Sequence, residues 1–160
     1  MFDELSLHIL DVAMNSIAAK ARTIEIGVLE SQRRDRLVLR VRDDGRGMDA
    51  ATLDRVFRRS ITTKSGRKKK IGLGLALLRQ TAEMCDGRFQ IQSTPGKGTR
   101  VTASMRLSHI DRPPLGNINA TVLSLCAASP DTDVRLRCRT DSDEFRFSSK
   151  ELNQEERTDT

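Results

Sequence analysis

The order of hydrophobic patterns in the first 107 residues limits the fold more than any other feature of this sequence. Apolar residues recur with helical spacing, alternate as in two strands, return to helical spacing, and alternate again. These patterns cover residues 4–21, 23–29, 37–41, 50–57, 71–84, 88–93 and 99–107. Because short polar turns join the strands of each pair, we expect hairpins. The sequence therefore predicts an α+β fold, a two-layer sandwich with a mixed, mostly antiparallel sheet and helices on one face.

The pattern changes after residue 107, where Pro113 and Pro114 interrupt any regular element. A small helix and a β-hairpin are expected beyond them, over residues 117–128, 134–138 and 144–147. The last residues are polar, and we expect them to be disordered. The chain thus divides into a main domain, an extension packed on it and a tail, over residues 1–107, 108–152 and 153–160.

The composition argues against several classes of protein. A net charge of +6 suits an anionic ligand. Trp and Tyr are absent, which argues against nucleic-acid binding, since aromatic side chains are the usual stacking platforms. No apolar run approaches the length that spans a membrane, and the acidic first residues are unlike a secretory signal. Three cysteines without metal-ligand spacing indicate idle thiols in a reducing cytoplasm.

Two glycine motifs follow the patterns expected of a nucleotide site. Asp43-Asp-Gly45-Arg-Gly47 comes directly after a strand, where a carboxylate can accept a hydrogen bond from an exocyclic amine such as that of adenine. The glycines there allow a ligand to approach the backbone closely. Gly72-Leu-Gly74-Leu opens a helix after a basic loop, and free backbone N–H groups at such a position favour phosphate. Each motif alone is equally compatible with an ordinary turn or linker.

A polar stripe on the first helix is the third candidate. His8, Asp11 and Asn15 are spaced by three and four residues, which places them on one face. Carboxylate and amide oxygens are ligands that Mg²⁺ accepts while it keeps several waters. A solvated helix face would give the same pattern.

In combination and in this order, the motifs resemble those of the GHKL ATPase superfamily. That superfamily includes gyrase-type topoisomerases, heat-shock chaperone ATPases, mismatch-repair ATPases and histidine kinases. The resemblance spans residues 4–107 and rests on five segments, at residues 8–16, 43–48, 56–64, 72–78 and 93–99. It implies the Bergerat type of α/β sandwich, with ATP and Mg²⁺ as ligands.

The resemblance also implies a role for each matched residue. Asn15 would hold Mg²⁺, and Asp43 would bind the adenine amine with the support of Thr99. Residues 58–71 would form a lid whose basic side chains could reach the γ-phosphate. The other expected nucleotide contacts are Gly45, Gly47, Met48, Lys64, Ile71, Gly72, Leu73, Gly74 and Leu75.

Two departures from the superfamily pattern concern the chemical step. Asp11 is the candidate catalytic base, but it stands where hydrolysing members often carry the longer glutamate. Ala18 stands where histidine kinases usually carry a basic residue. The resemblance therefore implies ATP binding more strongly than it implies hydrolysis.

Three functions are compatible with this sequence. A complete histidine kinase also carries a phosphoacceptor helix segment, and here the first motif begins almost at Met1. We prefer a stand-alone kinase that phosphorylates a separate bacterial signalling protein. An ATPase switch that regulates a partner and a non-catalytic nucleotide-sensing module remain as alternatives. The extension could widen the sheet, dock a partner or form a homodimer.

Overall fold

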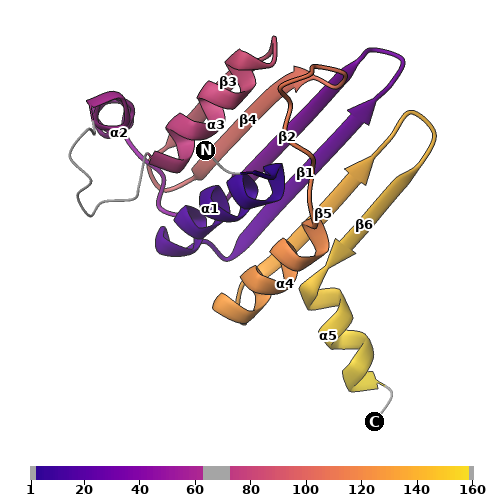
Figure 1. The fold of residues 1–160 in the computed structure, drawn as a ribbon. Coiled ribbons are helices and arrows are strands. Elements are labelled where there is room, and N and C mark those ends of the chain that lie inside the picture. Colours follow the sequence, from indigo (N-terminus) through magenta and orange to yellow (C-terminus); the bar gives the residue numbers. More distant parts are fainter. Residues whose placement is uncertain (1–2, 63–72, 159–160) are drawn as a thin grey trace.

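The computed structural model of the protein describes residues 3–62 and 73–158, which form a six-stranded sheet and five helices (Figure 1). The elements are, in chain order, α1 (Leu5–Ala18), β1 (Thr23–Ser31), β2 (Arg36–Asp43), α2 (Ala50–Thr62), α3 (Leu73–Met84), β3 (Arg88–Thr94), β4 (Gly98–Arg106), α4 (Ile118–Ala128), β5 (Asp133–Arg139), β6 (Glu144–Ser148) and α5 (Ser149–Thr158). The helix over residues 50–62 is longer than the sequence pattern indicated. Asp49 caps it, because its carboxylate accepts a hydrogen bond of 2.7 Å from the Thr52 N–H.

The sheet has the strand order β3-β4-β2-β1-β5-β6. All neighbouring strands are antiparallel except β1 and β5, which are parallel. The expected α+β sandwich with a mixed, mostly antiparallel sheet is therefore confirmed. The extension after residue 107 widens this sheet, because β5 lies beside the central strand β1.

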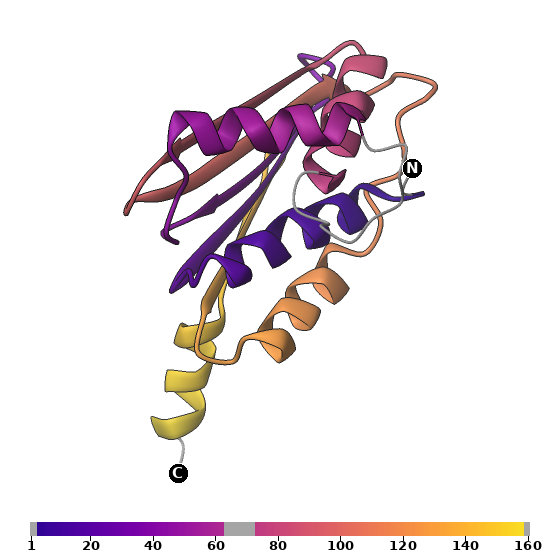
Figure 2. The same ribbon diagram turned by 90° about the vertical axis from the view of Figure 1, so that its left-hand side faces the viewer.

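One face of the sheet is apolar and carries the helices. Figure 2 shows α1, α3 and α4 on the same side of the strands, and α2 packs against α3. The strands alternate, so that every second residue points into this layer. The core consists largely of aliphatic side chains, including Leu5, Ile9, Ile24, Ile26, Leu37, Leu39, Leu78, Met105, Leu125, Val134 and Leu136.

The extension also holds the start of the first helix. The N–H groups of Leu5 and Ser6 donate to the carbonyl oxygens of Pro114 and Leu115, at 2.9 and 2.8 Å. These amides belong to the first turn of α1 and have no partner within the helix. The Thr121 hydroxyl on α4 donates in turn to the Ser6 carbonyl at 3.1 Å. Residues 114–121 thus act as the amino-terminal cap of α1.

Residues 153–158 of the tail that was expected to be disordered are helical in the structure. Residues 149–158 form α5, which extends away from the sheet with the side chains of residues 150–157 exposed (Figure 1). The Ser149 hydroxyl accepts a hydrogen bond of 2.9 Å from the Val134 N–H, and this contact fixes the first turn against β5. The polar composition of this segment predicted disorder, because composition carries no information about a contact between residues far apart in the sequence.

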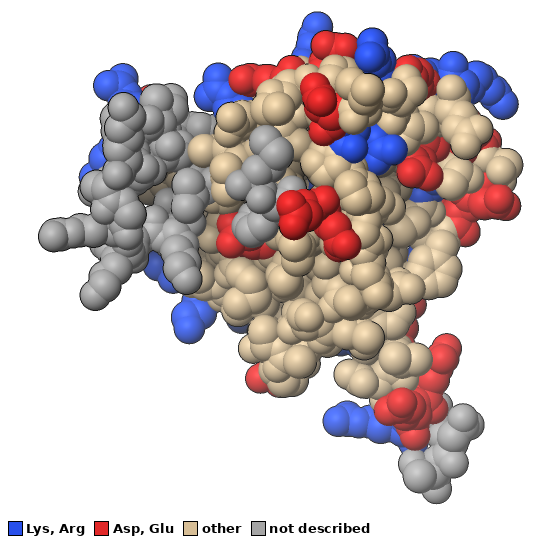
Figure 3. Space-filling view, in the orientation of Figure 1, with Lys and Arg blue, Asp and Glu red and all other residues tan. Residues whose placement is uncertain are grey.

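Charge is distributed unequally between the two faces. Within the sequences of α1 and α4, Asp11 is the one charged residue. Figure 3 shows this side of the molecule, where the surface over α4 and the adjoining part of α1 is largely uncharged. Leu7 and Met14 of α1 and Leu123 of α4 are exposed. No helix in the described ranges is both long and apolar enough to span a lipid bilayer.

Candidate functional site

A pocket of about 370 Å³ lies between α1, α2, α3 and the helix-covered face of the sheet. Its walls are mostly apolar, and a few polar groups converge on them, as is typical of a small-molecule site. The lining residues are Val12, Asn15, Ser16, Ala18, Ala19, Val41, Asp43, Arg46, Gly47, Met48, Thr52, Arg55, Val56, Leu75, Ile91, Thr99 and Val101. Asn15, Asp43, Gly47, Met48, Leu75 and Thr99 were expected at a nucleotide site, and the structure brings all six together.

Asp43 is the polar centre of the pocket. It is the last residue of β2, and the alternation of that strand directs its side chain toward α1. Its Oδ2 accepts a hydrogen bond of 2.6 Å from the Ser16 hydroxyl, and its Oδ1 accepts one of 2.8 Å from the Gly45 N–H. A carboxylate has about four acceptor positions, so the remaining ones can receive donors from a ligand. The side chain is thus oriented before any ligand arrives.

The turn after Asp43 requires glycine for two different reasons. Gly47 has a φ of +67°, which L side chains rarely adopt, and a Cβ on it would lie 2.0 Å from the Thr94 carbonyl oxygen. A Cβ on Gly45 would lie 2.9 Å from the Cβ of Ala19. Gly45 therefore allows the end of α1 to approach the turn, and Gly47 allows the β3–β4 turn to approach it from the other side.

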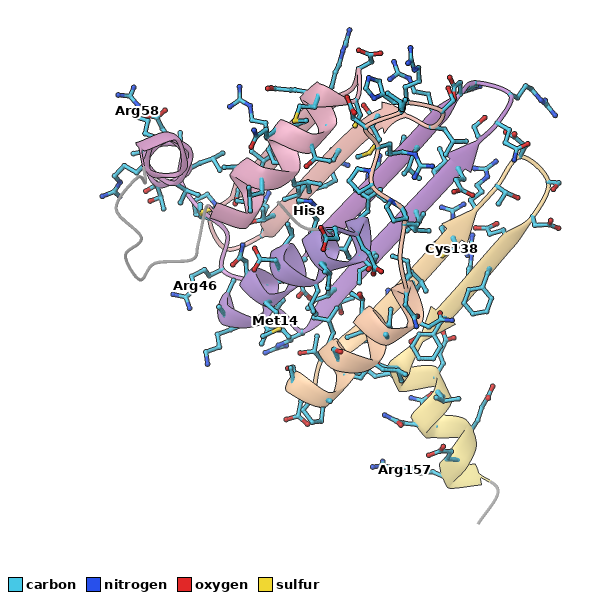
Figure 4. The ribbon with its side chains drawn as sticks, viewed as in Figure 1. His8, Met14, Arg46, Arg58, Cys138 and Arg157 are labelled. Atoms are coloured by element: carbon cyan, nitrogen blue, oxygen red, sulfur yellow. The ribbon has the colours of Figure 1, made fainter. Side chains whose placement is uncertain are left out.

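The same turn is attached to three neighbouring segments. The Arg46 N–H donates to the Ala19 carbonyl at 2.9 Å, and its guanidinium donates to the Ala18 carbonyl at 2.9 Å, which places the side chain at the end of α1 (Figure 4). The Gly96 N–H donates to the Arg46 carbonyl at 2.7 Å. The Asp44 carboxylate accepts from the N–H groups of Arg22 and Thr23, at 2.8 and 2.9 Å. These bonds hold the floor of the pocket in one conformation.

A second hydroxyl group reaches the pocket from β4. Thr99 Oγ1 lies 2.8 Å from Ser93 Oγ, and the Ser93 hydroxyl also accepts a hydrogen bond of 2.7 Å from the Met48 N–H. Thr99 pairs with Asp43 across the β2–β4 ladder. The two side chains therefore lie side by side on one rim, where they can contact the same edge of a planar ligand.

The polar stripe expected on α1 separates into three environments. Asn15 lines the pocket. Asp11 is half-buried and lies outside the residues that line the pocket; its Oδ2 lies 1.6 Å from where a Cβ on Gly74 would stand. His8 is fully buried, so it belongs to the core and not to a solvated polar face. The structure thus gives Gly74 a function that the motif did not indicate, since it makes room for the Asp11 carboxylate.

The burial of His8 predicts a pH dependence of stability. Burial lowers the pKa of His8 from 6.5 to about 4. Between these values the unfolded chain binds more protons than the folded chain, so the free energy of unfolding falls as the pH falls from 6.5 toward 4. Between pH 7 and pH 5 we expect a loss of roughly 2 kcal/mol from this group.

Urea unfolding at the two pH values measures this loss. The His8→Gln variant should lose less stability on acidification than the wild type. Substitution of the other histidine, His109→Gln, serves as the control. If His8→Gln retains the full pH dependence, another group is responsible.

Several expected contacts cannot be placed. Lys64, Ile71 and Gly72 lie outside the described residues, as does most of the expected lid. Leu73 is the first residue of α3. The contributions of these residues to a nucleotide site remain predictions.

Sequence reasoning missed five polar residues of the site, which are Ser16, Arg46, Thr52, Arg55 and Ser93. Ser16 is buried on the face of α1 that packs against the sheet, and its hydroxyl donates a hydrogen bond to Asp43. A serine within an otherwise apolar helix face was the available signal. Arg46 and Ser93 lie in motifs that were recognised, but their contacts depend on segments that meet only in the folded chain.

The three cysteines are all free. Burial raises the pKa of the Cys85, Cys126 and Cys138 thiols, so they stay protonated near neutral pH. Within the described ranges, no group of three His, Cys, Asp or Glu side chains could hold a metal ion.

Comparisons with known proteins agree with this geometry. A family model described as histidine kinase-, DNA gyrase B- and HSP90-like ATPase matches residues 2–109. The sensor histidine kinase ZraS of Escherichia coli strain K12 is 31% identical over 114 residues, which cover 71% of this chain and 24% of ZraS. Sporulation kinase D of Bacillus subtilis strain 168 is 30% identical over 110 residues, which cover 66% of this chain and 20% of that kinase. The chain thus spans a minor part of the length of these relatives.

A solved structure extends the similarity to the whole fold. The crystal structure of the N-terminal domain of a DNA repair protein superposes with a TM-score of 0.59 and 13% sequence identity, over 92% of this chain and 53% of that one. At this identity the superposition shows the fold alone. The family match over residues 2–109, on a chain with this sheet and pocket, shows that the protein belongs to the histidine kinase-, DNA gyrase B- and HSP90-like ATPase family and carries an ATP-binding domain like that of the histidine kinases.

Proposed function

We propose that this chain binds Mg-ATP in the pocket around Asp43 and acts as a protein kinase that phosphorylates a separate bacterial signalling partner. The observation that carries the proposal is the orientation of the Asp43 carboxylate by Ser16 and Gly45 at the rim of an apolar pocket. An adenine ring offers an amine donor on the edge of a flat apolar body, which matches this arrangement. The names of the relatives, sensor histidine kinases and a sporulation kinase, support phosphoryl transfer as the use of the nucleotide.

Asn15 would bind the magnesium ion in this proposal. Its side chain lines the pocket one turn before the end of α1, and an amide oxygen is a suitable ligand for Mg²⁺. A site with one protein ligand fits a metal that is otherwise held by phosphate oxygens and water. Bound Mg²⁺ would neutralise charge on the phosphates during transfer.

Thermal unfolding with and without Mg²⁺ tests the role of Asn15. In the wild type, ATP should raise the midpoint of unfolding, and Mg²⁺ should raise it further, because a ligand that binds the folded state stabilises it. In Asn15→Ala we expect the increment from Mg²⁺ to disappear while a smaller one from ATP alone remains. Asn119→Ala, at an exposed amide on α4, is the matched control. An undiminished Mg²⁺ increment in Asn15→Ala would remove this residue from the metal site.

Incubation with γ-labelled ATP and candidate partner proteins tests the kinase activity itself. Label on a partner, lost in Asp43→Asn, is the expected result. Release of labelled phosphate without labelled protein would instead indicate an ATPase switch. ATP binding without either product would indicate a nucleotide-sensing module.

A further inference from the structure

The face of the sheet that points away from α1, α3 and α4 is rich in arginine. Because strand residues alternate, the outward positions are read directly from the register. They include Arg36, Arg40, Arg42, Arg88, Arg100, Arg106, Arg135, Arg137, Arg139 and Arg146. The nucleotide pocket lies on the opposite side of the sheet, so its function does not account for these side chains.

Gly27 forms a gap in the middle of this face. It lies in β1, directly between Arg40 of β2 and Arg137 of β5 in the pairing register. A hollow of about 500 Å³ opens over it, lined by Glu25, Ile26, Gly27, Arg40, Arg42, Arg135, Leu136, Arg137, Arg146, Phe147, Ser148 and Glu151. A Cβ on Gly27 would meet its nearest neighbour, the Cβ of Arg40, at 3.7 Å, which is ordinary contact. The backbone therefore does not require glycine here. The absence of a side chain at Gly27 leaves the hollow open.

The two walls of the hollow differ in how their arginines are held. On the β5–β6 side, Arg137 and Arg146 share the Glu144 carboxylate. Arg135 binds Asp133 at 2.7 Å and Glu25 at 3.5 Å. These ion pairs fix the guanidinium groups of that wall and leave some of their N–H donors unused.

On the β2 side, the arginines carry uncompensated charge. Within the described part of the chain, the side chains of Arg40 and Arg42 have no hydrogen-bond or ion-pair partner. Glu25 and Glu151 also line the hollow, but Glu25 is paired with Arg135, and the Glu151 carboxylate also attracts the Arg135 guanidinium. The positive charge that is free to act on a ligand therefore lies on the β2 wall, opposite arginines that are already oriented.

We propose that this hollow, the Gly27 site, binds a small anion of the pyrophosphate type. Neighbouring strands are about 4.8 Å apart, so the Cα atoms of Arg40 and Arg137 are roughly 10 Å apart across Gly27. An anion seated between them must present oxygens in both directions. A diphosphate group does this, whereas a lone carboxylate has two oxygens in one plane. Guanidinium groups form paired, charge-assisted hydrogen bonds to phosphate oxygens.

Nuclear magnetic resonance of the ¹⁵N-labelled chain can locate the anion. On titration with inorganic pyrophosphate, we expect saturable shifts of the backbone amides of Gly27, Arg40 and Arg137. Binding at the ATP pocket would be recognised separately, by shifts at Gly45 and Gly47. Shifts confined to Gly45 and Gly47 would overturn the proposal.

Three variants distinguish binding of pyrophosphate inside the hollow from non-specific attraction by all the arginines of this face. Gly27→Leu fills the hollow without a change in charge, and Arg40→Gln removes one free guanidinium; each should weaken pyrophosphate binding at least tenfold. Arg88→Gln removes a charge of the same face outside the hollow, and we expect less than a twofold change. All three should retain stabilisation by ATP, which shows that they are folded.

Two results would contradict the proposal. Equal binding of pyrophosphate by wild type and Gly27→Leu would mean that only the field of the arginines attracts the anion. A short DNA duplex would share that attraction, and its binding should depend steeply on salt. If duplex binds more tightly than pyrophosphate and equally well to Gly27→Leu, the face is a nucleic-acid surface and the proposal is wrong.

Discussion

Asp43→Asn is expected to weaken ATP binding roughly tenfold to a hundredfold, which corresponds to about 1.5–3 kcal/mol for a hydrogen bond to a charged group. The carboxylate accepts from Ser16 and Gly45 and offers its remaining positions to the pocket. The asparagine side chain replaces one of the two acceptor oxygens with an NH₂ donor. That donor must face either the Ser16 and Gly45 donors or the exocyclic amine of the purine, and each arrangement loses a hydrogen bond.

Calorimetric titration with ATP measures this effect, and Asp44→Asn is its matched control. The Asp44 carboxylate accepts from backbone N–H groups of Arg22 and Thr23, and an amide oxygen can still do so. We expect its affinity for ATP to remain within about twofold of the wild type. If both variants bind ATP equally well, Asp43 does not contact the base.

The same substitution should alter the choice between purines. Guanine carries an acceptor oxygen where adenine carries the amine, and a carboxylate repels it. The wild type should therefore prefer ATP over GTP, and Asp43→Asn should reduce this preference. An unchanged ratio of the two affinities would indicate that another group reads the base.

Gly47→Ala is expected to lower the free energy of unfolding by roughly 2–5 kcal/mol. The left-handed conformation at φ +67° costs a side chain about 1–2 kcal/mol, and overpacking against backbone costs about 1–3 kcal/mol more. The added methyl group would lie 2.0 Å from the Thr94 carbonyl oxygen, and a backbone atom cannot rotate away as a side chain can. The turn would have to move away from β3, and the floor of the ATP pocket would move with it.

Gly96→Ala provides the matched control for this prediction. Gly96 also has a left-handed φ, of +76°, but a Cβ on it would meet nothing within 4 Å. Its substitution should therefore cost only the conformational strain, about 1–2 kcal/mol. Urea unfolding of both variants measures the difference. Equal losses would show that conformational strain, and not the contact with Thr94, makes glycine necessary at position 47.

The fold was largely predictable because most of its determinants are local. The alternation in β1 and β2 and the short turn between them predict a hairpin, and the structure contains it. The pairing of β1 with β5 could not be predicted in the same way. Thr23 and Asp133 are partners in that ladder, and no local pattern relates residues so far apart.

The residues of the candidate site were likewise predictable where a local motif marks them, and not where long-range packing places them. Asn15, Asp43 and Thr99 could be chosen in advance because each lies in a recognisable motif, and all three line the pocket. The place of Asp11 over Gly74 could not be chosen, since it depends on the packing of α3 against α1. The sequence motif singled out Gly74, but only the packing of α3 against α1 shows that a side chain there would collide with the Asp11 carboxylate.

The cap on α1 has a consequence for the order in which the protein can fold during synthesis. The N–H groups in the first turn of this helix donate to the carbonyl groups of Pro114 and Leu115. The neighbouring strand β1 pairs early with β2, but it gains its second partner only at residues 133–139. Contacts of such high sequence separation form late, because the intervening chain must first be ordered. The helix that carries Asn15 and Ser16 is therefore synthesised before the segments that stabilise it, and it reaches its final stability only after residues 114–139 have been added.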